Sequence, residues 1–433
     1  MKKLTFLLHL LTLSVQSLAQ SFTPNYDEAK VGSYTLPNPL LMPNGQRINT
    51  PAQWRQQRIY WLNQFAEQVY GHTPTQKVQV RYETVSVSNA LEGRAMRKIV
   101  RIYFTQYPQL APIEVLLYIP TRVHYPVAVA VGLNFMGNHS VTTEPDVPIS
   151  TRWATNTSDS AVVNHRFTEK SRGRQASRWA INELMNNDIA LATAYYGDIE
   201  PDYPDGWRSG IRSVLGDSSQ PNNWGAIGAW AWGLSRIMDY LQTEKQIDTR
   251  RSFLTGHSRL GKAALWAAAQ DERFAAVNSN CSGEGGAALA RRNFGETVAR
   301  INSSFPHWFC QNFKKYNENP NSLPTDQHLL LALIAPRPLY VASAEDDLWA
   351  DPYGEFLSLK AAQPVYQLYG VKDFPIEKQP PVNLPIGEKI RYHIRTGKHD
   401  VTAYDWAQYI DFIQKQLVPS VITKDNPSKK RTN

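Results

Sequence analysis

A serine flanked by glycines gives this chain its clearest chemical signal. The run Gly-His-Ser-Arg-Leu-Gly at positions 256–261 lies between an apolar strand end and an alanine-rich stretch that extends to residue 273. A sharp Gly-x-Ser turn from strand to helix exposes the nucleophilic serine of α/β-hydrolases, and its strained backbone demands small neighbours. The usual second glycine comes two places after the serine, where this chain has Leu260, and Gly261 follows one place later. The pattern therefore predicts either a nucleophile at Ser258 or a serine that merely caps a helix.

A catalytic serine needs a histidine, and the position of His399 fits that role. A serine hydroxyl attacks only when a base takes its proton, and an acid must orient that base. In α/β-hydrolases these partners follow the serine in the order acid, then histidine. The other histidines after Ser258 are His307, His328 and His393, whereas His399 alone lies in a loop between the last predicted strand and the last predicted helix. We therefore predict His399 as the base.

Three consecutive carboxylates, Glu345, Asp346 and Asp347, occupy the loop where the acid is expected. A run of this kind is often only a solvated turn, and the spacing alone leaves all three open. Hydrolase loops often read Gly-Glu-Asp-Asp with the second aspartate as the acid. Placing Ala344 on that glycine assigns the role to Asp347.

Apolar patterns predict the elements that must hold these residues. They indicate strands at 78–82, 98–104, 113–119, 128–135, 189–195, 252–255, 275–279, 329–334, 339–343, 366–369 and 390–395. Helices are predicted at 54–70, 179–185, 224–241, from the serine turn to about 270, and at 403–417. Strands that come first and then alternate with helices are typical of an α/β-hydrolase fold, a three-layer sandwich with a mostly parallel central sheet.

Three loops could border the site. The loop after the predicted strand 128–135 contains Gly137 and is either a plain turn or the source of one oxyanion-hole N–H group. The polar stretch 142–174 is predicted to be a surface loop or an insertion. The Pro/Asp/Gly-rich stretch 201–223 is too long for a simple connection, so it could form a wall of the site.

The two ends of the chain differ from its body. Residues 1–19 have a basic tip, a short apolar run and small residues before the expected cleavage site, which is typical of a secretory signal peptide. We therefore expect a secreted or periplasmic protein. Residues 20–420 are predicted to form a single catalytic domain, followed by a disordered tail at 421–433.

Charge and motifs exclude several function classes. Lys2 and Lys3 leave with the signal and the tail carries a net +3, so about +3 of the formal charge of +8 remains on the body. The body has no Lys/Arg block with interleaved aromatics, and we expect no nucleic-acid partner. It also lacks a dinucleotide fingerprint and a phosphate-binding loop, so we expect no cofactor and no metal. We further expect no membrane association and a monomer.

The sequence contains two cysteines, Cys281 and Cys310. In an oxidising compartment an even pair is more often a disulfide than two free thiols. We therefore predict a disulfide bond between them, close to the predicted site. The alternative is two buried, unpaired cysteines that act as small apolar residues.

Several motifs together resemble one enzyme family. They are Gly256-His-Ser-Arg-Leu-Gly-Lys262, Asp271-Glu-Arg-Phe274, Phe294-Gly-Glu-Thr297, Phe305-Pro-His-Trp-Phe309, Ile334-Ala-Pro-Arg-Pro338, Trp349-Ala-Asp-Pro352 and His399-Asp400. Their order and content, from about residue 134 to 406, resemble the glucuronoyl esterases of carbohydrate esterase family 15, bacterial type. The resemblance implies hydrolysis of esters that join 4-O-methyl-glucuronate on xylan to lignin alcohols. The expected partner is a glucuronate-bearing polysaccharide or lignin–carbohydrate ester.

The same resemblance implies roles for individual residues. It makes Ser258 the nucleophile and His399 the base, and it makes Arg259 a donor to the oxyanion. Lys262, Glu296 and Trp349 would bind the uronate sugar. Without the resemblance, these three would be read as a helix-surface lysine, a capping glutamate and a core tryptophan. Esterases of other glycan esters, and an inactive glycan-binding homologue, are the alternative functions.

The chain departs from the family pattern at the acid. Many members carry the triad acid as a glutamate soon after the serine, in a segment that reads Ser-Asn-Cys-Ser-Gly at 279–283 here. Cys281 stands where that glutamate would be, and the next carboxylate is Glu284. The acid is therefore expected in the alternative position, at Asp347, and we predict that the disulfide replaces the missing ionic contacts.

Overall fold

The structure is a computed structural model that describes residues 22–217, 219–372 and 377–418. The predicted signal peptide at 1–19 and the predicted tail at 421–433 lie outside the described residues. Among the described helices, none is both long and apolar enough to cross a membrane.

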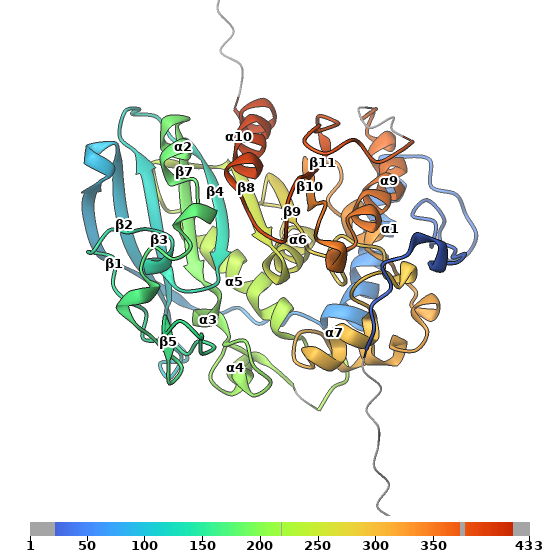
Figure 1. The fold of residues 1–433 in the computed structure, drawn as a ribbon, viewed down its shortest axis with the longest axis horizontal. Coiled ribbons are helices and arrows are strands. Elements are labelled where there is room, and N and C mark those ends of the chain that lie inside the picture. The colour runs from blue at the N-terminus through green and yellow to red at the C-terminus, as the bar shows by residue number, and fades with distance from the viewer. Residues whose placement is uncertain (1–21, 218, 373–376, 419–433) are drawn as a thin grey trace, which may run out of the picture.

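One nine-stranded mixed sheet organises the described chain, and Figure 1 shows its strands in order from left to right. The order is β1 (Val80–Ala90), β2 (Ala95–Phe104), β3 (Ile113–Pro120), β7 (Ile189–Tyr195), β4 (Val127–Asn134), β8 (Ile247–His257), β9 (Ala276–Asn280), β10 (Leu339–Ala344) and β11 (Ile390–Arg395). The pairs from β1 to β7 are antiparallel, and the pairs from β7 to β11 are parallel. A separate two-stranded ribbon joins β5 (Val162–Val163) to β6 (Arg166–Phe167).

Helices cover both faces of this sheet. They are α1 (Pro51–Phe65), α2 (Ile181–Asn186), α3 (Tyr196–Ile199), α4 (Arg212–Leu215), α5 (Ala226–Leu241), α6 (Arg259–Gln270), α7 (Val298–Ser304), α8 (Gln327–Ala332), α9 (Pro352–Leu368) and α10 (Ala403–Leu417). Successive strand residues point to opposite faces, so Phe253 packs in the core under α10 while Leu254 packs in the core under α5 and α6. The predicted three-layer α/β architecture is confirmed.

Two predicted strands are wrong. Residues 329–334 fall in and just after helix α8, whose first turn is capped when the Asp326 carboxylate accepts from the Gln327 N–H at 2.7 Å. Residues 366–369 form the end of helix α9 and its cap. Short apolar runs do not distinguish a buried helix from a buried strand, because both lose the polar side of their pattern. The predicted helix at 54–70 is present as α1 followed by a π-helical turn, Ala66–Tyr70.

A tight turn between β8 and α6 exposes Ser258. This residue has φ 56° and ψ −130°, a strained backbone conformation for a residue with a side chain. A Cβ atom on Gly256 would lie 2.1 Å from the Leu260 carbonyl oxygen. The offset Gly261 also sits in a close contact, because its Cβ atom would lie 3.0 Å from the Ser282 Cβ atom. The two glycines therefore allow neighbouring backbone and side chains to lie close to the turn. Leu260, which replaces the usual second glycine, is buried in the core.

We expect Gly256→Ala to destabilise the protein by about 3 kcal/mol or more, since the added methyl group meets backbone that cannot move aside. Gly261→Ala should cost less, because its closest neighbour is a serine side-chain carbon at 3.0 Å. Urea denaturation of both variants measures the difference. Equal stability of Gly256→Ala and the wild type would contradict the close contact at the turn.

Candidate active site

A cavity of about 350 Å³ opens beside the Ser258 turn. It lies where β8, β9 and β10 end, which is the usual edge for ligand sites in parallel sheets. Every residue predicted for the site lines it except Cys310. The lining residues are Ser258, Arg259, Lys262, Cys281, Ser282, Gly283, Glu296, Phe305, Trp308, Asp347, Trp349, Ala350 and His399.

His399 and Asp347 form a hydrogen-bonded pair. The His399 Nδ1 atom lies 2.6 Å from the Asp347 Oδ2 atom. Asp347 follows β10 with its side chain 5% exposed, whereas the neighbouring Asp346 is exposed. With Nδ1 donating to a carboxylate, Nε2 is the nitrogen that can accept a proton. The arrangement can therefore take a proton from a hydroxyl in the cavity, and Ser258 supplies one.

Arg259 is held rigidly beside the serine. Its guanidinium forms an ion pair with Asp202 and lies 4.8 Å over the Trp308 ring. Asp202 also accepts from His307 Nε2 at 2.8 Å and from Trp308 Nε1 at 2.7 Å. Burial alone would raise the pKa of Asp202, but the His307 hydrogen bond and the Arg259 charge outweigh it and lower the pKa to about 2. Asp202 belongs to the stretch 201–223, which does not itself line this cavity but reaches it through the ion pair with Arg259.

Lys262 and Glu296 place opposite charges on the far wall. The Lys262 Nζ atom donates to the Ser282 carbonyl oxygen, and only 4% of the residue is exposed. Burial lowers the pKa of Lys262, and the charge of Glu296 opposes that shift. Burial likewise raises the pKa of Glu296, and Lys262 opposes it. The two groups thus stabilise each other's charged forms inside the cavity.

Trp349 lies at the more open side of the cavity. It is 36% exposed, and its carbonyl oxygen accepts from the Glu296 N–H at 3.0 Å. The Phe22 ring packs edge-on against it, with 6.0 Å between the ring centroids. Such a half-exposed indole offers an apolar face to a flat ligand.

The chain is similar to several known esterases. A family model described as glucuronyl esterase, fungi, matches residues 218–370. The chain is 43% identical over 400 residues to the carbohydrate esterase MZ0003 from an unknown prokaryotic organism, which covers 91% of this chain and 92% of that protein. A solved glucuronoyl esterase from Solibacter usitatus is 47% identical, with a TM-score of 0.84 over 90% of this chain and 99% of its own. A 4-O-methyl-glucuronoyl methylesterase from Phanerochaete chrysosporium is 39% identical over 157 residues, which are 34% of this chain and 33% of that protein.

This chain belongs to the glucuronoyl esterase family, carbohydrate esterase family 15. The match to the Solibacter usitatus glucuronoyl esterase decides this, because it is 47% identical and spans 90% of this chain and 99% of the other. The fungal family model ends at residue 370, before His399. His399 lies outside that match, and its candidacy as the base rests on its loop position and its hydrogen bond with Asp347.

The predicted disulfide is wrong, because both cysteines are free and buried. Cys281 lines the cavity, where its sulfur, an Asp347 oxygen and a His399 nitrogen all lie within 4.8 Å of one another. Cys310 instead packs against the π-helical turn Ala66–Tyr70, with its sulfur 3.8 Å from the Glu67 carbonyl oxygen. The two thiols thus face different parts of the molecule. Burial and the nearby Asp347 raise the pKa of the Cys281 thiol well above its usual value, so it stays protonated and neutral.

His257 lies beside the predicted base and was not itself predicted. Its buried ring lies 4.4 Å from the His399 ring, measured between centroids. Its Nδ1 atom lies 2.7 Å from the Asn280 side-chain oxygen. Burial and the proximity of His399 lower the pKa of His257 well below its usual value, so the ring is neutral. The only sequence signal was its position directly before Ser258.

The loop at 134–139 lies beside the serine turn. The Phe135 ring packs edge-on against His257, with 6.2 Å between the ring centroids, and the Arg259 guanidinium lies 6.0 Å from its centre. Gly137 has φ 83°, which favours glycine at that position. Whether this loop donates to an oxyanion stays a prediction.

Glu355 fixes the segment that carries Cys281. Its buried carboxyl group accepts from the Ser282 N–H at 2.8 Å, the Gly283 N–H at 3.0 Å and the Ser343 hydroxyl at 2.6 Å. Burial is the main reason that its pKa rises to about 8, and Asp347 adds to the shift. Glu355 is therefore protonated at neutral pH, and nothing in its local sequence indicated this role.

We expect Glu355→Gln to change how stability depends on pH. Between its ordinary pKa of 4.5 and its folded pKa of about 8, only the folded wild type keeps the proton. The wild type therefore loses stability as pH rises through this window, by at most about 1.4 kcal/mol per pH unit. Glutamine cannot lose a proton. In urea denaturation, the free energy of unfolding of the variant relative to the wild type should therefore be higher at pH 8 than at pH 5.

The exposed Glu318 provides the matched control, because Glu318→Gln changes the same group in water. The free energy of unfolding of Glu318→Gln should equal that of the wild type at both pH values. A Glu355→Gln variant whose stability differs from the wild type by the same amount at pH 5 and pH 8 would contradict the raised pKa.

Proposed function

We propose that this carbohydrate esterase hydrolyses esters of glucuronic acid, in particular 4-O-methyl-glucuronoyl esters that join xylan to lignin alcohols. The observation that carries the proposal is the strained Ser258 turn in one cavity with the His399–Asp347 pair and two cationic side chains. The names of its relatives, a glucuronoyl esterase and a 4-O-methyl-glucuronoyl methylesterase, support the choice of substrate. The signal-like residues 1–19 support action outside the cytoplasm.

In the first step the Ser258 oxygen attacks the ester carbonyl carbon, C6 of the glucuronate. His399 accepts the serine proton at Nε2, and Asp347 stabilises the imidazolium through Nδ1. The C–O bond to the alcohol then breaks, and His399 passes the proton to the departing alkoxide. The product of this step is a glucuronoyl ester on Ser258 and a free alcohol.

In the second step water replaces the alcohol. His399 takes a proton from the water, which attacks the acyl-enzyme carbonyl, and the proton returns to the Ser258 oxygen as that bond breaks. Both steps place negative charge on the carbonyl oxygen. Arg259 stabilises this charge, because Asp202 and Trp308 hold its guanidinium in place before the reaction begins.

The remaining cavity residues bind the sugar. The Lys262 ammonium has three N–H donors, of which the Ser282 carbonyl takes one, so the others can reach sugar oxygens. The Glu296 carboxylate accepts from neighbouring hydroxyls, and Trp349 contacts the apolar face of the pyranose ring. Ester hydrolysis of benzyl or methyl glucuronate, with acetylated sugars as competitors, tests this assignment. Exclusive removal of acetyl groups would contradict it, and so would failure of a serine-directed covalent probe to label Ser258.

We expect Asp347→Asn to lower kcat by orders of magnitude, because an amide neither fixes the His399 tautomer nor stabilises its cation. The corresponding change in a serine protease costs about 10⁴-fold. Hydrolysis of benzyl glucuronate measures the effect. Asp346→Asn is the matched control, since that exposed neighbour should retain nearly full activity. Near wild-type turnover by Asp347→Asn would show that another group is the acid.

A further inference from the structure

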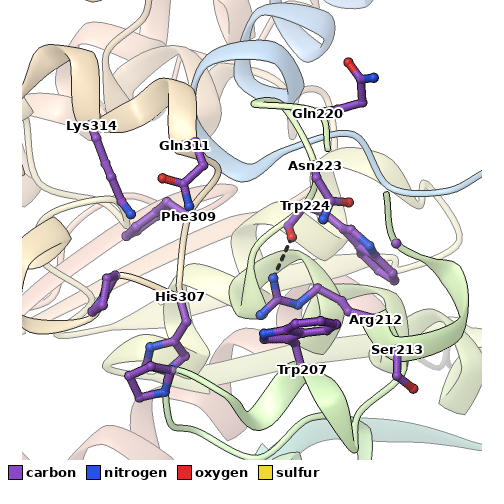
Figure 2. Close-up of a pocket in the computed structure, with 13 residues that line it drawn as sticks. Trp207, Arg212, Ser213, Gln220, Asn223, Trp224, His307, Phe309, Gln311 and Lys314 are labelled. Carbon is purple, nitrogen blue, oxygen red and sulfur yellow. Dashed lines mark hydrogen bonds between the residues drawn. The ribbon is translucent and has the colours of Figure 1, made fainter. Parts of the chain in front are cut away.

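A second cavity of about 490 Å³ adjoins the active site and has no part in the chemistry above. Figure 2 shows that side chains from two segments, 204–224 and 306–314, surround it. The segment 305–309 separates it from the first cavity. Phe305 and Trp308 line the Ser258 cavity, whereas Pro306, His307 and Phe309 line the second. A ligand large enough to fill both would therefore pass over this segment.

A buried nitrogen at the bottom of the second cavity has no partner. The His307 side chain is 6% exposed, and its Nδ1 atom makes no hydrogen bond with any described residue. Its Nε2 atom lies 2.8 Å from Asp202, whose pKa of about 2 makes it a carboxylate that can only accept. Nε2 therefore donates to Asp202, and Nδ1 is left without a partner. A buried polar atom without a partner is costly, and a ligand hydroxyl, which can both donate and accept, would satisfy it.

Two polar side chains on the opposite wall are also unpaired. Gln311 and Lys314 line the cavity, and their side chains make no hydrogen bond or ion pair with any described residue. The half-buried Trp207 indole borders the same space and supplies apolar surface. No acidic residue is among the described residues that line the cavity. An aromatic surface, an unpaired imidazole nitrogen, an amide and an ammonium together suit the hydroxyl-rich faces of a pyranose.

The positive charge in the cavity is only partly neutralised. Arg212 also lines it, but its guanidinium pairs with the buried Glu200. It also donates to the Trp224 carbonyl oxygen, a bond that Figure 2 marks with a dashed line. Lys314 is therefore the cation that remains for a ligand oxygen. One free ammonium does not require an anionic ligand, because sugar hydroxyls accept from it as well.

We propose that the second cavity is a glycan subsite that binds another pyranose of the polysaccharide whose glucuronate ester enters the Ser258 cavity. The inference rests on the proposed function, since it takes the ligand to be the same glycan. A sugar hydroxyl hydrogen-bonds to His307 Nδ1, Gln311 and Lys314 hydrogen-bond to ring substituents, and Trp207 packs on the ring. The subsite then favours esters on an oligosaccharide over esters of the monosaccharide alone.

Kinetics with two substrates test the subsite. Benzyl glucuronate reaches only the Ser258 cavity, whereas the benzyl ester of glucuronate on xylotriose is long enough to reach both. Trp207→Ala and Lys314→Ala should each raise KM for the oligosaccharide ester by about tenfold, the loss expected for one good contact. The kcat/KM for benzyl glucuronate should stay within about twofold of the wild type, because neither residue lines the first cavity.

Matched variants control for folding and for charge. Trp207→Phe keeps an aromatic surface and should retain most of the preference for the oligosaccharide. Lys315→Ala removes the same charge from the next residue, which is exposed and outside the cavity, and should leave both substrates unaffected. Equal effects of Trp207→Ala on both substrates, or no effect on either, would overturn the subsite.

A binding measurement separates this inference from the proposed function. Calorimetric titration of xylotriose into Ser258→Ala requires no catalysis, and we expect binding that Trp207→Ala or Lys314→Ala weakens about tenfold. Binding without any cleavage of glucuronate esters by the wild type would support the subsite and refute the proposed function. Cleavage of benzyl glucuronate by the wild type without xylotriose binding would support the function and refute the subsite.

Discussion

The close approach of backbone at the Ser258 turn is the constraint on which the site depends. Ser258 adopts its unfavourable conformation because β8 is paired on both sides, and its own N–H donates to the Asn280 carbonyl oxygen at 2.9 Å. Strain of this kind costs about 1–3 kcal/mol, and the burial of α6 offsets it. The same turn sets the phase of α6: Leu260 enters the core, whereas Arg259 and Lys262 border the cavity. One backbone geometry therefore positions the serine and both cations.

Buried hydrogen bonds then hold the charges where the turn puts them. Asp202 joins Arg259, His307 and Trp308, so one carboxylate fixes the guanidinium and the segment between the two cavities. Removing one partner from such a buried network typically costs about 3–5 kcal/mol, because it leaves a charge unpaired. A positive group fixed in this way does not reorganise when an oxyanion forms. Because the segment 305–309 is held in place, the distance and orientation between the two cavities are fixed. A ligand that spans both cavities requires this.

The sequence predicted the residues of the site better than the contacts that support them. Ser258 and His399 follow from chain order and loop position, and most strands follow from their apolar runs between turn residues. The strand predicted at 329–334 failed because a short apolar run is equally suited to a buried helix. Asp202 and Glu355 could not be found this way, because their hydrogen-bond partners, Arg259 and Ser282, lie 57 and 73 positions away in the sequence. The predicted disulfide failed for the same reason, because two cysteines in a sequence carry no information about the directions of their side chains.

The free Cys281 thiol gives a physical reason to propose Asp347 as the acid. Cys281, Glu355 and Asp347 are three acidic groups near one another, and like charges in a buried site disfavour each other. The first two remain protonated at neutral pH, because burial and the neighbouring Asp347 both raise their pKa values. Asp347 is also the member of the group that is hydrogen-bonded to the histidine. A second carboxylate at position 281 would compete with it for the same imidazole, whereas a neutral thiol fills the space without a charge. The thiol and the protonated Glu355 thus concentrate the negative charge on the side of His399 where it orients the ring.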